Sequence, residues 1–278
     1  MDWRLGDGSA SGTLRSMTAH AWDRAGSLPV PVSGRPRPEL VALPVEDIDV
    51  ATLFTFMRDA ELRFETLRMR LVETTVTARG RHTVNTDVVL RHVGQAKVTT
   101  SDPHRKTAGN YEIWTSDGEV VRTYSATRRL ATERPVREAV RGVEGREARD
   151  LPGRSRIYRP LTALPMETLP DTFVHPAGYL QNVVATGDCR IAGAGTHLGR
   201  ETIVVTSDHP RTSEVHFERP DVRIELTVDR DSGVIVRLLE SVGGEITRRA
   251  EVTDFGPDAP LPPSAFDFRI PPDARMLY

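Results

Sequence analysis

The histidines of this chain do not form a recognisable site. The sequence holds eight of them: His20, His82, His92, His104, His175, His197, His209 and His216. No two stand at the spacing of a metal-ligand pair on a helix or a strand. His175 is the least ordinary, because it precedes Pro176 and follows Asp171 by four positions. We favour a local structural or capping role for it over catalysis.

Cys189 is the only cysteine. A single cysteine excludes an internal disulfide and a zinc site built from several cysteines. A nucleophilic role would need a positioned histidine, which a linear sequence does not show. We therefore favour a thiol that fills space in the core.

Two spacings imitate known binding loops and fail in detail. Asp229-x-Asp231-x-Gly233 with Glu240 resembles a calcium loop, but its glycine falls one position early and residues 234 to 239 are typical of a strand. Gly193-x-Gly195-x-x-x-Gly199 is not the dinucleotide fingerprint, because the third glycine is displaced and a strand-like run follows it. The sequence thus predicts no catalytic residue, no metal site and no cofactor.

Composition gives no reason to expect a nucleic-acid partner. The net charge is −2, and the basic residues are spread along the chain instead of gathering on one stripe. No window approaches 18 apolar residues, so no transmembrane helix is predicted.

The C-terminal third carries the clearest structural pattern. Val222 to Leu226, Val234 to Leu239 and Ile246 to Phe255 read as three strands. Their connectors, Asp231-Ser232-Gly233 and Gly243-Gly244, tolerate the positive φ that tight hairpins require. Such a meander predicts a large curved antiparallel sheet.

The rest of the chain adds a helix and further strands. Asp47 or Asp49 is expected to cap a helix whose apolar stripe comprises Leu53, Phe56, Met57, Ala60 and Phe64. Leu67, Met69 and Leu71 alternate with arginines, as on a half-buried strand. Strands are also expected over Val84 to Val93, Tyr111 to Trp114 and Val120 to Tyr124, with a turn at Asp117-Gly118 and an extension of the sheet at Arg128 to Leu130. Pro160 to Leu169 and His175 to Val184 are expected to be helical in part.

These motifs resemble the LolA-like superfamily, which includes periplasmic lipoprotein carriers and the sensor of the envelope-stress sigma factor. The resemblance rests on the strand-turn succession above, on Phe266-x-Phe268-x-x-Pro271-Pro272-x-Ala274, on His175-Pro-Ala-Gly178-Tyr-Leu180 and on Gly199-Arg200-Glu201 opening a strand. The resemblance covers roughly Leu53 to Met276, and the chain is similar to the actinobacterial members of the superfamily. It implies an α+β fold: a large curved antiparallel β-sheet, or half-barrel, covered by helices.

The N-terminal segment indicates both the domain organisation and the cellular location of the chain. Residues 1 to 44 are rich in Gly, Pro and Arg without an apolar period, so we expect a disordered or loosely packed extension before a single LolA-like domain over residues 45 to 278. The start is too polar for a signal peptide, which predicts a cytoplasmic location for the chain as written. A true start further upstream would make it extracytoplasmic, as in most relatives.

The resemblance implies non-catalytic binding or carriage of an apolar, lipid or acylated ligand in a cavity between sheet and helices. The predicted cavity residues are Phe56, Met57, Ala60, Leu67, Met69 and Leu71. Two alternatives stay open: an enzyme that tailors an apolar metabolite in the same cavity, and a regulatory module that binds a protein partner. Convergent polar groups in the cavity would favour the enzyme, and a purely apolar lining would favour the carrier.

Overall fold

The protein is built on one large sheet. The computed structural model describes residues 40, 42–44, 46–105, 109–136, 160–210 and 221–277. Its strands are β1 (Thr66–Thr77), β2 (Gly80–Arg91), β3 (Gln95–Ser101), β4 (Tyr111–Asp117), β5 (Val120–Ser125), β6 (Leu130–Pro135), β7 (Asp188–His197), β8 (Arg200–Asp208), β9 (Val222–Asp229), β10 (Ile235–Val242), β11 (Glu245–Pro257) and β12 (Arg275–Leu277).

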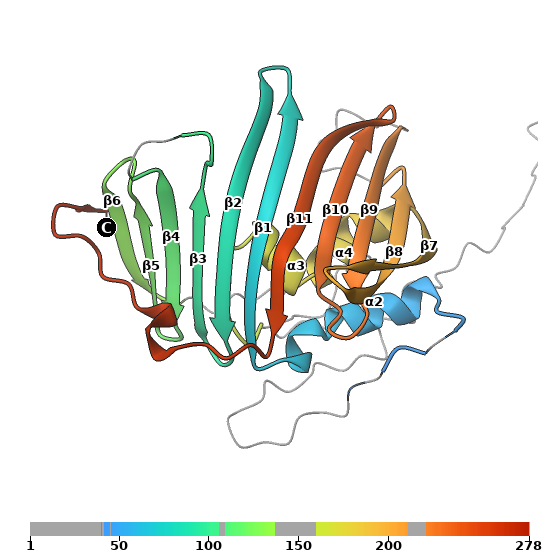
Figure 1. The fold of residues 1–278 in the computed structure, drawn as a ribbon, viewed down its shortest axis with the longest axis horizontal. Coiled ribbons are helices and arrows are strands. Elements are labelled where there is room, and N and C mark those ends of the chain that lie inside the picture. The colour runs from blue at the N-terminus through green and yellow to red at the C-terminus, as the bar shows by residue number, and fades with distance from the viewer. Residues whose placement is uncertain are drawn as a thin grey trace, which may run out of the picture.

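Two antiparallel meanders make up this sheet. The strand order is β12-β6-β5-β4-β3-β2-β1-β11-β10-β9-β8-β7, so β1 joins the meander β1 to β6 to the meander β7 to β11. Among the strands of the described ranges, only the short β12 pairs in parallel, with β6. The predicted strands, the three predicted turns and the curved antiparallel sheet are confirmed (Figure 1).

The helices gather against the half of the sheet that contains β7 to β11 (Figure 1). They are α2 (Val50–Arg58), α3 (Leu169–Val174) and α4 (Ala177–Asn182), with the 3-10 turns η1 (Ala60–Arg63), η3 (Val184–Thr186) and η4 (Pro263–Phe266). Among the described residues, no α-helix covers β3 to β6. The two halves of the concave face therefore differ: one is packed, the other open.

Helix α2 begins where the sequence predicts. Asp49 caps it, its side chain accepting a hydrogen bond from the backbone N–H of Thr52 at 2.6 Å. The helix ends at Arg58, earlier than the apolar stripe indicates, and Phe64 follows η1 in extended conformation. Phe64 is still buried, so the stripe predicts burial beyond the end of the helix.

The expectation of a partly helical segment over Pro160 to Leu169 is wrong. The residues from Pro160 to Thr168 form bends and a turn, and α3 starts only at Leu169. Proline has no backbone N–H to donate and disfavours helical conformation in the residue before it, so Pro160 and Pro165 keep this stretch irregular. The helical expectation for His175 to Val184 is confirmed by α4 and η3.

The extension and the domain boundary stay predictions. Residues 1–39, 41 and 45 lie outside the described part of the chain, as do residues 137–159 of the excursion before α3. No helix among the described residues is long and apolar enough to cross a membrane.

Both the backbone conformation and the packing around it require glycine at position 233. Its φ is +78°, and an added Cβ would lie 3.1 Å from the ring of Phe56 and 3.3 Å from the Cα of Met57. Gly233→Ala is expected to lower the free energy of unfolding by about 2 to 3 kcal/mol, combining left-handed strain with overpacking. Gly244→Ala is the matched control, because Gly244 has φ +81° and open space around it. It should cost only about 1 kcal/mol, and equal losses in denaturant titrations would contradict the packing argument.

Candidate functional site

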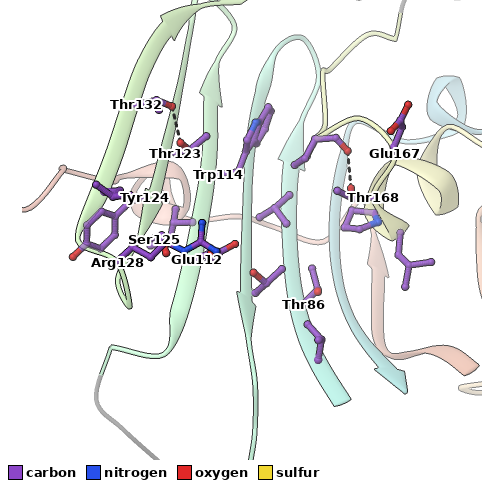
Figure 2. Close-up of a pocket in the computed structure, with 18 of the residues that line it drawn as sticks. Thr86, Glu112, Trp114, Thr123, Tyr124, Ser125, Arg128, Thr132, Glu167 and Thr168 are labelled. Carbon is purple, nitrogen blue, oxygen red and sulfur yellow. Dashed lines mark hydrogen bonds between the residues drawn. The ribbon is translucent and has the colours of Figure 1, made fainter. Parts of the chain in front are cut away.

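A cavity of about 560 Å³ lies on the open half of the concave face (Figure 2). The strand register explains its lining, because cross-strand partners point to the same face of a sheet. One row of partners crosses β3 to β6 as Val98, Trp114, Thr123 and Thr132. A second row crosses β2 to β6 as Thr86, Thr100, Glu112, Ser125 and Leu130. All nine side chains line the cavity.

The segment that leads into α3 forms the wall opposite β5 and β6. Glu167 and Thr168 project from this side in Figure 2, and Pro165, Leu169 and Pro170 also line the cavity. Leu277 reaches it from β12. The cavity is thus enclosed by residues far apart in the sequence.

The lining mixes apolar and hydroxyl groups. Val84, Val98, Trp114 and Leu130 supply apolar surface, while the hydroxyls of Thr123 and Thr132 lie 2.6 Å apart and satisfy each other. The lining is therefore neither purely apolar nor a set of converging reactive groups. It suits a ligand with an apolar body and polar parts.

An ion-pair network closes the end of the cavity next to the packed half. Arg248 Nε lies 2.7 Å from Glu73 Oε1, and an Arg248 terminal nitrogen lies 3.4 Å from Glu240 Oε1. Burial by itself lowers the pKa of Arg248, but the charges of Glu240 and Glu73 outweigh it and raise the pKa. The Tyr179 hydroxyl lies 3.5 Å from Glu240 Oε1, and burial followed by the Glu240 charge raises its pKa. Both groups therefore keep their protons.

His175 lies in a second, fully buried cluster. Its Nε2 is 3.1 Å from Glu61 Oε2 and its Nδ1 is 3.0 Å from Asp171 Oδ1. Burial lowers the pKa of His175, yet the charge of Glu61 and the bond to Asp171 prevail and raise it to about 9. Glu61 also accepts a hydrogen bond from the backbone N–H of Leu161 at 2.8 Å. The cluster thus joins η1, α3 and the segment before α3, in keeping with a structural role.

Glu61 is the member of this cluster that sequence reasoning missed. It stands inside the predicted apolar helix, where a lone glutamate is normally assigned to the solvent side, yet it is 1% exposed. Nothing in the neighbouring residues distinguished it, since Asp59, Arg63 and Glu65 are charged as well. Across the described ranges, no three His, Cys, Asp or Glu side chains are arranged to hold a metal ion.

The thiol of Cys189 has the environment of a packing group. It is half-buried and lies 2.9 Å from the carbonyl oxygen of Val184. Burial raises its pKa, so the thiol stays protonated.

The six residues predicted to line a cavity lie together in the packed core. Each is at most 4% exposed, and all belong to one apolar cluster with Phe173 and Leu180 of the helices. None of them lines the 560 Å³ cavity. Phe56 alone borders a separate depression of about 260 Å³, beside Ala51 and Arg63. The use of these six residues by a ligand stays a prediction.

Comparisons with known proteins give matches among solved structures only. No protein-family model and no curated protein matches the chain. The complex of Pseudomonas aeruginosa MucA and MucB is similar over 81% of this chain, at 13% identity and a TM-score of 0.45. An uncharacterized conserved protein from Thermus thermophilus is similar over 82% of this chain, at 9% identity and a TM-score of 0.43. The Mycobacterium tuberculosis lipoprotein LppX is similar over 77% of this chain, at 12% identity and a TM-score of 0.37.

Coverage of the matched chains differs. The similarity spans 62% of the MucB chain in the complex, against 99% of the Thermus protein and 99% of LppX. Strand order, curvature and one-sided helical cover give this chain the curved antiparallel half-barrel architecture that its sequence resemblance implied.

Proposed function

We propose that the protein binds and carries an apolar or acylated ligand in the cavity on the open half of the concave face. The observation that carries the proposal is the cavity itself, about 560 Å³ in volume, on the half of the sheet that no described α-helix covers. This volume falls in the range typical of small-molecule sites, about 300 to 1,000 Å³.

Exposed apolar side chains at the border of the cavity support this proposal. Leu277 lines it and is 42% exposed, while Met166 stands between the lining residues Pro165 and Glu167 and is 62% exposed. Large apolar groups left in water near a concave site favour entry of an apolar ligand. Methionine adapts to different ligand shapes.

The free energy gained by burying an acyl chain is large enough to give measurable binding. An acyl chain gains about 0.8 kcal/mol per buried methylene, or about 10 kcal/mol for most of a sixteen-carbon chain. Ordering of ligand and side chains takes back several kcal/mol. The remaining free energy, about 6 kcal/mol, corresponds to a dissociation constant of tens of micromolar.

Titration with a pyrene-labelled hexadecanoic acid tests the proposal. We expect saturable binding of one probe per chain, with a Kd of tens of micromolar, and displacement by unlabelled hexadecanoate. Fluorescence that rises linearly without saturation, and that unlabelled acid does not reduce, would contradict the proposal.

A further inference from the structure

The apolar cavity continues into a polar compartment. A second cavity of about 420 Å³ shares five lining residues with the first: Val84, Thr100, Glu112, Ser125 and Arg128. Because one set of side chains borders both, they are adjoining compartments of one groove. Beyond the junction the lining turns polar, with His82, Asp102, Asn110 and Thr127.

Two opposite charges stand at the junction. Glu112 on β4 and Arg128 in the turn between β5 and β6 are both exposed and both line the two compartments (Figure 2). Within the described part of the chain, neither forms an ion pair or a side-chain hydrogen bond. Ser125, the cross-strand partner of Glu112, has a buried Oγ with no hydrogen-bond partner there either.

Except for Glu167, the other charged side chains that line the groove are already compensated. Asp102 lies 3.4 Å from Arg105 and 3.8 Å from His82 in the second compartment. Arg248 is held between Glu73 and Glu240 at the far end of the first. Glu167 lines only the first compartment, on the opposite wall. The junction is thus the place where one negative and one positive side chain face both compartments without partners.

We infer that the ligand is an amphiphile whose headgroup carries both charges, an ammonium placed at Glu112 and a phosphate placed at Arg128. The inference rests on the proposed function, since the acyl chain occupies the first compartment. Rotation of the Ser125 side chain, whose Oγ is buried and has no partner in the described part of the chain, would let its hydroxyl donate to the phosphate. A headgroup with a single charge would leave one of the two side chains uncompensated as the ligand excludes water.

Two lysophospholipids with the same myristoyl chain test the inference, used below their micellar concentrations. Lysophosphatidylethanolamine carries both charges, and lysophosphatidylglycerol carries the phosphate alone. The full chain is expected to bind the first about threefold to fivefold more tightly, the range of a partly exposed ion pair. Glu112→Gln should remove this preference, and Arg128→Gln should weaken both lipids by a similar factor. Glu119→Gln, an exposed glutamate outside both compartments, is the matched control and should change neither.

The outcomes separate this inference from the proposed function. Equal affinity for the two lysolipids, tighter binding of lysophosphatidylglycerol, or an unchanged preference in Glu112→Gln overturns the headgroup assignment while leaving acyl-chain binding intact. Failure of both lysolipids alongside saturable binding of the pyrene probe also overturns it. Failure of all three ligands overturns the proposed function itself.

Discussion

His175→Ala is expected to lower the free energy of unfolding by about 3 to 5 kcal/mol, the usual cost of removing one partner from a buried ion pair. The reason is the position of the imidazolium between two buried carboxylates, 3.1 Å from Glu61 and 3.0 Å from Asp171. Denaturant titration at pH 7 measures the change. The loss should be accompanied by exposure of apolar surface, because the cluster joins η1 to α3 within the core.

The same cluster predicts a pH dependence. The pKa of His175 is about 9 in the folded protein, above its ordinary value of 6.5. A raised folded-state pKa stabilises the protein fully below pH 6.5, and this stabilisation disappears as the pH rises through about 9. The free energy of unfolding should therefore fall between pH 7 and pH 10, and His175→Ala should lose the part of this fall that His175 causes.

His82→Ala is the matched control. The His82 side chain is 62% exposed and lies 3.8 Å from Asp102, so its removal should change the free energy of unfolding by less than about 0.5 kcal/mol. Equal stability of the two variants would contradict the structural role assigned to the cluster.

Val84→Trp is expected to weaken binding of the pyrene probe at least tenfold. Val84 is half-buried on β2 and borders both compartments, so the larger side chain would occupy the space where the acyl chain enters. Because the added ring would enter an open cavity, the cost to stability should be below about 1 kcal/mol, less than the 1 to 3 kcal/mol of overpacking a filled core. Probe titration and thermal unfolding measure the two effects.

Val89→Trp provides the matched comparison on the same strand. Val89 is also half-buried, and an odd separation from Val84 places it on the opposite face of the sheet. This variant should bind the probe as the unsubstituted protein does. A similar loss of binding in both variants would show that the tryptophan acts by disturbing β2 and not by filling the cavity.

The sheet could be predicted because its signals are local. The hairpins at Gly118, Gly233 and Gly243-Gly244 have residues that adopt positive φ, and Leu67, Met69 and Leu71 alternate with arginines. Strand β3 escaped prediction since its sequence is rich in polar and threonine residues, and its inward positions Ala96, Val98 and Thr100 are a weak alternation.

The cavity could not be predicted, because hydrophobic periodicity shows which side chains are buried and does not show where space between them stays unfilled. The apolar stripe of α2 and the first strand marked side chains that are indeed buried, but the structure packs them against α3 and α4. The open space depends on register across β2 to β6 and on the segment before α3, which returns to the sheet some 30 residues after β6 along the chain. Nothing in a linear sequence shows that approach.

Mapping the ligand on the protein tests the central claim most directly. A hexadecanoic acid with a diazirine near the end of its chain would be bound, photolysed and located by peptide mass spectrometry. The account predicts cross-links on the lining of the open half, at Val84, Val98, Trp114 or Leu130. Cross-links confined to Phe56, Met57 or Met69 in the packed core, or labelling that unlabelled acid does not suppress, would contradict it.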